Sequence, residues 1–494
     1  MKKTTVYTLM LLFPLLGWSQ WNQIGQNLLG DAAGDRFGVN VSISDDNAII
    51  AVGAFDNDVN GTNAGQVKVF RYENGAWTQI GQSLYGDAAG DGFGRGVSVN
   101  SAGTILAVGA NDGGGANGPE SGHVKIYENI NNTWTQIGQT IEGAANGDDF
   151  GFQISINDSG TIVAIGARFH DVIGFSDGEV RIFENVNNTW TQIGQDINGS
   201  ASNDKLGSRV ELSGDGSKVA ISAITSNQSR GHVAIYENIN NSWVKIGQNI
   251  DGEANGDISG QGLGFSNNGT IVAIGAANND SNGSNSGHVR VFKFENGNWS
   301  QVGQELVGDS SGDNFGIDVA LSDDGTILAV SAGGNGVFST NTGYCKLYQL
   351  QNNSWVQVGA TIPNNQSGDL SNFIALNASG SRIIIGTPSS DANGSDAGIV
   401  RVFGNALLSV AESSFTSKIA LYPNPVVHTS TIDLGKRYDT VMMQIVNSNG
   451  QQVTQHTYTR MQNLTVDTTT FAPGMYIIHL ISNKEKATVK MMKR

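Results

Sequence analysis

The sequence predicts an all-β protein, a seven-bladed β-propeller followed by a small β-sandwich. Three observations support this class. The phrase Trp-x-x-Ile/Val-Gly recurs seven times at intervals of about 56 residues, and each interval contains the apolar–polar alternation typical of strands. The composition then changes sharply near residue 405. With 38% apolar residues, the 494-residue chain has enough apolar side chains for a folded core.

The N-terminus has the features of an export signal. Lys2 and Lys3 form a basic start, and Val6–Leu16 is a mostly apolar run of about eleven residues, which is too short to span a bilayer. Small residues precede a cleavage point after Ser19. We therefore expect a signal peptide over residues 1–19 and no transmembrane segment in the mature chain.

Each repeat is marked by one tryptophan and one aspartate. The tryptophans are Trp21, Trp77, Trp134, Trp190, Trp243, Trp299 and Trp355. The aspartates are Asp35, Asp91, Asp148, Asp204, Asp257, Asp313 and Asp369. We expect each aspartate to cap the turn that enters the first strand of its repeat, and a ligand role shared by all seven is the alternative.

Each repeat contains four strand patterns and no helix pattern. In the first copy, apolar residues alternate over residues 39–44, run continuously over residues 49–52, and alternate again around Lys68. A more polar strand follows at residues 77–82, and turn-forming residues separate the four stretches. Such four-stranded units are typical of propeller blades, because packing blades in a ring covers the faces that a single blade exposes.

The order of the marks predicts how the ring closes. The first repeated element, Trp21–Leu28, corresponds to a fourth strand, whereas the last, Ile399–Phe403, corresponds to a third strand. We therefore expect a propeller over residues 20–404 whose last blade is completed by the N-terminal strand. This pairing would remove an open sheet edge, which favours aggregation.

Phe-Gly pairs followed by a strand and Gly-Ala, such as Phe37-Gly38 and then Val52-Gly53-Ala54, resemble FG-GAP repeats. This family implies the seven-bladed propeller of integrin α-subunits and many bacterial surface proteins. The pattern weakens where Leu206-Gly207 and Ser259-Gly260 replace Phe-Gly. Integrin-like repeats place a calcium loop between strands 1 and 2. Here that connection is a short turn, such as Asp323-Asp324-Gly325, so calcium is not carried over to it.

Four short motifs follow one another near the C-terminus. Their marking residues are Tyr422, Pro423, Asn424, Pro425, Asn449, Gly450, Gly474 and Tyr476, and a basic strand comes last. In order and spacing, residues 417–494 resemble the type A C-terminal sorting domain of the type IX secretion system of Bacteroidota. The resemblance implies a β-sandwich recognised by that secretion machinery and joined to the propeller by a linker over residues 405–416. We expect an exported protein, released or displayed on the outer surface. An ordinary adhesive β-sandwich is the alternative.

Charge and cysteine content exclude several classes of function. Residues 20–404 contain 17 basic and 39 acidic residues, whereas residues 405–494 contain 9 and 5. An acidic propeller disfavours nucleic-acid and anionic-membrane binding, which reward basic surfaces. The single cysteine, Cys345, excludes an internal disulfide and a Cys-cluster metal site.

The long loops are the expected binding region. In a four-stranded blade, the loop between strands 2 and 3 and the link from strand 4 to the next blade emerge on one side, and both are long here, as in Phe55–Ala64 and Gly30–Arg36. Three such loops have alternate Asp and Asn residues at the spacing of half a calcium loop. The candidate Ca²⁺ ligands are Asp56, Asp58, Asn60, Asn278, Asp280, Asn282, Asp391 and Asn393. Val67 occupies the position of the twelfth-residue glutamate, so turn formation without metal is the alternative.

The sequence favours a non-enzymatic binding or adhesion module for a glycan or protein ligand. It contains no nucleophile elbow, phosphate loop or His-metal spacing, and His123, His232 and His288 occupy one repeat position in separate blades. Two features break the repeat and could mark a unique site, residues 168–171 and Asp318. The alternatives are a secreted polysaccharide-acting enzyme and a passive spacer.

Overall fold

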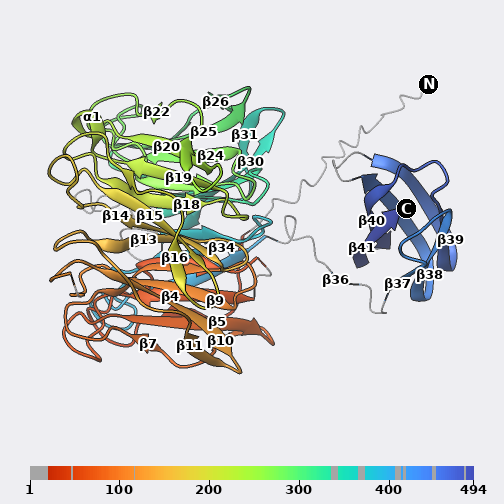
Figure 1. Ribbon diagram of the computed structural model, residues 1–494, viewed down its shortest axis with the longest axis horizontal. Helices are drawn as coiled ribbons and strands as arrows, with labels where there is room; N and C mark the ends of the chain where they lie inside the picture. Colours follow the sequence, from red (N-terminus) through yellow and green to blue (C-terminus); the bar gives the residue numbers. More distant parts are fainter. Residues whose placement is uncertain are drawn as a thin grey trace, which may run out of the picture. The chain divides into compact units, whose positions relative to one another are not determined.

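The computed structural model describes residues 21–45, 48–115, 117–334, 343–364, 373–405, 413–414, 419–447, 452–482 and 485–493. The predicted signal peptide and most of the predicted linker lie outside these residues. The chain divides into two compact units, Met1–Leu408 and Ser409–Arg494 (Figure 1). No described helix has the length and hydropathy needed to cross a membrane.

Seven five-stranded antiparallel sheets make up the described part of the first unit. The first four are β3 (Asn40–Ile43), β4 (Ile49–Ala54), β5 (Gln66–Glu73), β6 (Ala76–Gln79) and β7 (Leu84–Tyr85); β8 (Phe93–Val99), β9 (Ile105–Ala110), β10 (His123–Ile130), β11 (Thr133–Gln136) and β12 (Ile141–Glu142); β13 (Phe150–Ile156), β14 (Ile162–Ala167), β15 (Glu179–Asn185), β16 (Trp190–Gln192) and β17 (Ile197–Asn198); and β18 (Leu206–Leu212), β19 (Lys218–Ala223), β20 (His232–Asn238), β21 (Trp243–Lys245) and β22 (Ile250–Asp251).

The other three sheets continue the same order. They are β23 (Gly262–Phe265), β24 (Ile271–Ala276), β25 (His288–Glu295), β26 (Asn298–Gln301) and β27 (Leu306–Val307); β28 (Phe315–Leu321), β29 (Ile327–Ala332), β30 (Tyr344–Gln351), β31 (Ser354–Gln357) and β32 (Ile362–Pro363); and β33 (Phe373–Leu376), β34 (Arg382–Thr387) and β35 (Ile399–Gly404), which pairs with β1 (Asn22–Gln23) and β2 (Leu28–Leu29).

The first strands of the seven sheets form a closed ring. Each contacts the first strand of the next sheet, in the order β3, β8, β13, β18, β23, β28, β33 and back to β3. The all-β propeller prediction is therefore confirmed. The expected fourth strand of each blade is interrupted: in the first blade, a turn at Gly81, whose φ is +68°, separates β6 from β7, and both pair with β5.

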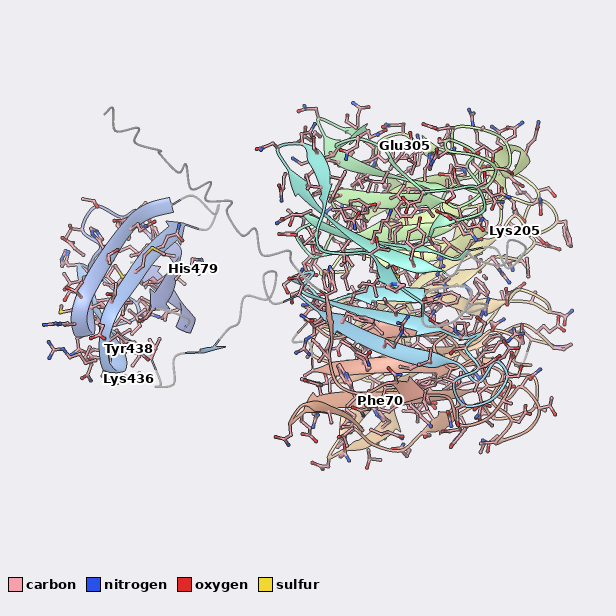
Figure 2. The ribbon with its side chains drawn as sticks, turned by 180° about the vertical axis from the view of Figure 1, so that it is seen from behind. Phe70, Lys205, Glu305, Lys436, Tyr438 and His479 are labelled. Carbon is pink, nitrogen blue, oxygen red and sulfur yellow. The ribbon has the colours of Figure 1, made fainter. Side chains whose placement is uncertain are left out.

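The hydrophobic core lies between neighbouring sheets. In the first interface, Val67 and Val69 of β5 pack with Val97 and Leu106 of the next sheet. Phe70, labelled in Figure 2, packs edge-on against Phe37, with ring centroids 6.3 Å apart. Because each sheet buries both faces against its neighbours, the second strands are almost entirely buried, as the continuous apolar run in each repeat predicts.

The repeated tryptophan phrase links each blade to the preceding one. In each of the seven phrases, the indole Nε1 of the tryptophan donates a hydrogen bond to the backbone carbonyl of the Ile or Val in the previous phrase. Trp77 donates to Ile24 over 2.9 Å, and Trp21 donates to Val358 over 2.9 Å. The glycine of the phrase is also required, because a Cβ on Gly25 would lie 2.6 Å from Trp77 Cδ1. The phrase is therefore a structural lock between blades.

The N-terminal strand closes the ring, as predicted. Asn22 pairs with Gly404 and Leu28 pairs with Val400, so β1 and β2 form the outer edge of the β33–β35 sheet. Leu28 is 6% exposed and packs in a cluster with Phe37 and Val400. The ring is therefore closed by non-covalent pairing of these N-terminal strands with β35.

One short helix interrupts the all-β pattern of the described residues. It is α1 (Ser226–Ser229), a single turn in the loop between β19 and β20. Asn227 and Gln228 both have positive φ inside it, so it is a tight turn rather than a regular helix. The sequence shows no helical periodicity there, which explains why no helix was expected.

The second unit is a six-stranded sheet. Its strands are β36 (Ser413–Ser414), β37 (Ala420–Tyr422), β38 (Thr429–Asn447), β39 (Gln452–Asp467), β40 (Gly474–Ser482) and β41 (Glu485–Lys493). Its strands are connected as one sheet, and the long β38 changes register against β39 between Asp433 and Tyr438. Ile432, Val441 and Ile478 belong to its buried core.

Candidate functional site

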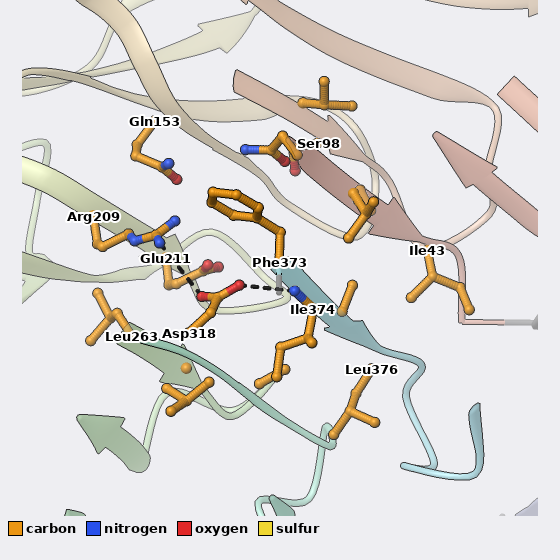
Figure 3. Close-up of a pocket in the computed structure, with 18 of the residues that line it drawn as sticks. Ile43, Ser98, Gln153, Arg209, Glu211, Leu263, Asp318, Phe373, Ile374 and Leu376 are labelled. Atoms are coloured by element: carbon orange, nitrogen blue, oxygen red, sulfur yellow. Dashed lines mark hydrogen bonds and ion pairs between the residues drawn. The ribbon is translucent and has the colours of Figure 1, made fainter. Parts of the chain in front are cut away.

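The central channel of the propeller contains a cavity of about 200 Å³. Its lining residues come from β3, β8, β13, β18, β23, β28 and β33, so every blade contributes. Figure 3 shows that most of the lining is small or apolar, including Ile43, Ser98 and Leu263. The charged residues of this lining are Arg209, Glu211 and Asp318.

The charged cluster joins blades four and six across the channel. Arg209 Nη2 lies 3.6 Å from Asp318 Oδ1, and the backbone N–H of Ile374 donates to Asp318 Oδ2 over 3.0 Å (Figure 3). Ser155 Oγ donates to Glu211 Oε2 over 3.4 Å. Burial, and then the charge of Asp318, raise the pKa of Glu211 to about 8, and burial also raises the pKa of Asp318. Glu211 therefore holds a proton at neutral pH.

Three arginines line a second cavity, of about 240 Å³, at the long-loop end of the channel. They are Arg95 and Arg209, near the starts of β8 and β18, and Arg168, which directly follows β14. The ends of these strands carry the long loops, so this cavity is the mouth of the channel on the predicted binding side. We call it the arginine mouth.

The opposite end of the channel is tied by hydrogen bonds between the short turns. Asp158 N–H donates to the Gly214 carbonyl over 3.0 Å, and Asp323 N–H donates to the Ala378 carbonyl over 2.9 Å. Burial, together with the nearby carboxylates of Asp45 and Asp158, raises the pKa of Asp323 to about 7. The channel is thus basic at one end and acidic at the other.

The long loops of the first blade are tied to the link that enters the next blade. Gly90 N–H donates to the Thr62 carbonyl over 2.9 Å, and Gly92 N–H donates to Asn63 over 3.1 Å. Equivalent pairs recur between other blades, as between Gly34 and Ser395. The two kinds of long connection therefore emerge on one side, as predicted. We call this side the long-loop face.

The repeated aspartates cap the turns that enter the first strands, as predicted. Asp35 Oδ2 accepts a hydrogen bond from Ala32 N–H over 2.9 Å, and Asp257 Oδ2 accepts one from Ala254 N–H over 2.9 Å. The same bond occurs at Asp91, Asp148, Asp204 and Asp313. Asp369 lies outside the described residues.

The candidate calcium loops use their polar side chains within the protein. In the first loop, Asp58 Oδ1 accepts from Asn63 N–H over 2.8 Å, Asn60 Nδ2 donates to the Gly86 carbonyl over 2.9 Å, and Asp56 lies 3.3 Å from Arg36 Nε.

The other two loops repeat this pattern. Their bonds run from Asn285 N–H to Asp280, from Asn282 to the Gly308 carbonyl, from Asp396 N–H to Asp391, and from Asn393 to the Gly30 carbonyl, while Asn278 Oδ1 lies 3.5 Å from Asn314 Nδ2. These contacts favour the turn-forming interpretation, and calcium binding there stays a prediction.

Two histidines lie beside carboxylates in sets that could hold a cation. One set is Asp87, Asp91 and His123, and the other is Glu253, His288 and Glu305, which is labelled in Figure 2. Each set is already paired with a base, because Lys125 contacts Asp87 over 2.5 Å and Arg290 contacts Glu253 over 3.4 Å. Burial lowers the pKa of both histidines, so the imidazoles are neutral at pH 7.

The loop after β14 exposes an apolar patch on the long-loop face. Val172, Ile173 and Phe175 are 47%, 63% and 73% exposed. Phe175 and Phe169 line a hollow of about 540 Å³ with Asp148 and Lys205. This loop contains the residues 168–171 that break the repeat, and it places Arg168 in the arginine mouth. We call residues 172–175 the apolar loop.

The sequence patterns predicted only some of the residues at the central channel. Arg168 and Asp318 were singled out because they break the repeat, and both lie at the channel. Arg95, Arg209 and Glu211 were missed. Aligning the seven copies of the first strand would have drawn attention to Glu211 and Arg209. Glu211 stands where other copies have Ser42, Ser98 or Gly264, and Arg209 is the one basic residue at a position held elsewhere by Asn40, Gly96, Gln153, Gly262, Asp318 and Phe373.

The sorting-motif residues lie on strands of the second unit and their connections. Tyr422 ends β37, and Met492 N–H donates to Asn424 Oδ1 over 2.8 Å. Gly474 begins β40, and the buried Tyr476 donates its hydroxyl to the Ala472 carbonyl over 2.8 Å. Pro423 and Pro425 lie in the connection to β38, and Asn449 and Gly450 lie outside the described residues.

Family models identify two segments of the chain. Residues 420–494 match the secretion system C-terminal sorting domain, and residues 30–70 match the FG-GAP repeat. No curated protein matches the sequence. The export and repeat assignments made from the sequence are therefore confirmed.

The solved structures that resemble this chain share little sequence with it. A protein described as a candidate 6-phosphogluconolactonase from Bacteroides uniformis is 12% identical, with a TM-score of 0.47 over 67% of this chain and 86% of that one. The periplasmic gluconolactonase of Pseudomonas aeruginosa is 13% identical, with a TM-score of 0.43 over 81% and 94%. The Dos1 propeller is 12% identical, with a TM-score of 0.43 over 78% and 96%.

The sheets, the repeat and the sorting domain together identify the class of protein. The ring of seven sheets contains the matched FG-GAP repeat in its first blade, and the second unit contains the matched sorting domain. The chain is a β-propeller protein with an FG-GAP repeat and a type IX secretion system sorting domain, and it is exported as cargo of that system to the cell surface or the extracellular space.

Proposed function

We propose that the propeller of residues 20–404 binds a glycan or protein ligand outside the cell and leaves it chemically unchanged. The observation that carries the proposal is the apolar loop. Ile173 and Phe175 are largely exposed beside a hollow on the long-loop face, and Arg168, in the same connection between β14 and β15, lines the arginine mouth. Exposed aromatic side chains next to a cavity are typical of ligand-contacting surfaces.

Affinity electrophoresis tests the binding function. Residues 20–404 would migrate through gels containing different polysaccharides, with calcium present, and pull-down on surface proteins would test protein ligands. We expect retardation by one ligand, which remains uncut.

A paired substitution locates the binding surface. Replacing both Ile173 and Phe175 with serine should abolish the retardation. Val59→Ser is the matched control, because Val59 is 60% exposed on the equivalent loop of the first blade. Equal retention by both variants would exclude the apolar loop as the contact surface, and failure to bind any ligand would favour a spacer role.

A polysaccharide-acting enzyme is the second candidate, and the carboxyl pair in the channel favours it. Burial and the charge of nearby Asp318 raise the pKa of Glu211 to about 8, so this carboxyl group can donate a proton at neutral pH, and a pair of carboxyl groups can serve as acid and base. Both side chains lie inside the channel, below the arginine mouth. Product formation from a retained polysaccharide that disappears in Glu211→Gln would establish this candidate over simple binding.

Fusion to a reporter tests the export role of residues 417–494 separately. A reporter carrying a signal peptide and this segment should reach the medium or the outer surface of a bacterium with the type IX system. The same reporter without the segment should stay in the periplasm. Periplasmic retention of both reporters would count against these boundaries.

A further inference from the structure

The arginine mouth concentrates positive charge in an otherwise acidic propeller. Arg95, Arg168 and Arg209 line a single cavity of about 240 Å³, although residues 20–404 contain 17 basic against 39 acidic residues. The three come from separate blades, so only the closed ring brings them together. Like charges repel, and such clusters are stable where anionic groups neutralise them.

Aromatic side chains hold two of the guanidinium groups in place. Phe152, which also lines the cavity, has Arg168 Cζ 3.5 Å and Arg95 Cζ 4.8 Å from its ring centroid. Phe55 lies 4.8 Å from Arg95 Cζ, and Phe169 lies 4.5 Å from Arg168 Cζ. These cation–π contacts hold the two guanidinium groups against the rings, and a guanidinium held in this way can donate two N–H groups to one oxyanion.

Two of the three arginines already have carboxylate partners. Arg168 Nε lies 2.5 Å from Asp149 Oδ2, and Arg209 Nη2 lies 3.6 Å from Asp318 Oδ1. Arg209 Nε also donates to the Gln261 carbonyl over 2.8 Å. Within the described part of the chain, no carboxylate lies within 4.0 Å of Arg95. Arg95 is therefore the guanidinium with unused hydrogen-bonding capacity.

The electrostatic environment of Arg95 agrees with this geometry. Burial, and then the charge of Arg168, lower its pKa to about 10, against the opposing effects of Asp149 and Asp112. The group stays charged at neutral pH, but its charge is not fully compensated. Burial also raises the pKa of Asp112 to about 6, so this nearby carboxylate is only weakly held in its ionised form.

We propose that the arginine mouth binds the oxyanion of an acidic saccharide, a uronate carboxylate or a sulfate ester, with Arg95 as the main contact. The cavity has room for about one sugar unit, and Gln153 and Phe373 add an amide and an aromatic side chain to its wall. The acidic surface around the mouth would repel a polyanion elsewhere, which restricts contact to this point. This inference rests on the proposed binding function and assigns its ligand class.

Isothermal titration of residues 20–494 with three probes tests the proposal. The probes are trigalacturonate, a sulfated κ-carrageenan oligosaccharide and neutral maltotriose. We expect one anionic probe to bind, and the probe that binds identifies carboxylate or sulfate as the recognised group. Raising NaCl from 50 to 500 mM should weaken this binding, and maltotriose should not bind.

Substitutions then assign the contact to Arg95. Arg95→Gln should weaken binding of the anionic probe about tenfold or more, since it removes a charge-assisted hydrogen bond. Arg95→Lys should recover part of the affinity. Arg71→Gln is the control, because it removes the same charge at an exposed position of β5. Unchanged melting temperatures would show that the variants are folded.

The possible failures separate this inference from the proposed function. If an anionic probe binds equally well to the wild type and to Arg95→Gln, the propeller still binds saccharides but the arginine mouth is not the site. If no anionic probe binds while a neutral polysaccharide or a protein does, the acidic-saccharide inference is overturned and the binding function stands. If nothing binds, both proposals fail.

Discussion

Ring closure by the N-terminal strand can be tested with two adjacent leucines. Leu28 is 6% exposed and belongs to the core cluster between the first and last blades, whereas Leu29, its neighbour in β2, is 41% exposed. Both pair with β35, at Val400 and Ile399. Replacing each with alanine therefore removes the same atoms from the same strand, and the two variants differ only in packing.

The expected shift follows from the burial. A buried Leu→Ala substitution costs about 2–5 kcal/mol, and an exposed one about 0.5 kcal/mol or less. At about 2.1 cal/mol/K per residue, a propeller of about 385 residues unfolds with an entropy near 0.8 kcal/mol/K. Leu28→Ala should then lower the Tm by about 3–6 °C, and Leu29→Ala by less than about 1 °C.

A deletion extends the same test. Removing residues 21–29 also removes the buried Trp21 and its hydrogen bond to the Val358 carbonyl, so the Tm should fall by about 6–12 °C. Scanning calorimetry of residues 20–404 gives the Tm, and hydrogen exchange of the peptide Ile399–Gly404 reports on the exposed edge. Equal Tm values for Leu28→Ala and Leu29→Ala, or an unchanged Tm after the deletion, would refute closure by this strand.

Three further predictions concern packing, protonation and metal. Gly109→Ala should lower the free energy of unfolding by about 2 kcal/mol or more, because the new Cβ would lie 2.1 Å from the Gly151 carbonyl oxygen of the next blade. Gly114→Ala should leave the stability unchanged, because the nearest atom to its Cβ lies 3.7 Å away. Similar chemical-denaturation midpoints for the two variants would contradict the close contact between blades. The Tm should fall as pH rises from 7 to 9, because Glu211, with a folded-state pKa of about 8, and Asp323, with one of about 7, then release protons that the unfolded chain has already lost. In a pH series, Glu211→Gln should remove most of this dependence of Tm on pH. An unaltered dependence would exclude Glu211 as its source. EDTA should leave the Tm within about 1 °C of its value in calcium, because in the first candidate calcium loop Asp58 already accepts the Asn63 N–H and Asn60 already donates to the Gly86 carbonyl. A larger fall in Tm that Asp58→Ala abolishes would establish calcium in that loop.

The sequence alone determined the architecture of the propeller and the route of the protein out of the cell. Seven tryptophan phrases, the period-two strands between them and the offset between Trp21–Leu28 and Ile399–Phe403 fixed the ring and its closing strand. This was possible because each blade is one local unit, so its pattern is complete within about 56 consecutive residues. The sorting segment was readable for the same reason, since its motifs lie close together in the chain.

The tertiary structure alone decided what the repeated and unrepeated residues do. The tryptophan phrase predicted a blade but not the hydrogen bond from Trp77 to Ile24, which crosses between blades. Arg95 and Arg209, or Glu211 and Asp318, are more than 100 residues apart and belong to blades that are not adjacent. They meet only because the ring brings its first strands around one channel. No local pattern encodes that proximity, and for this reason the candidate site became visible only in the closed ring.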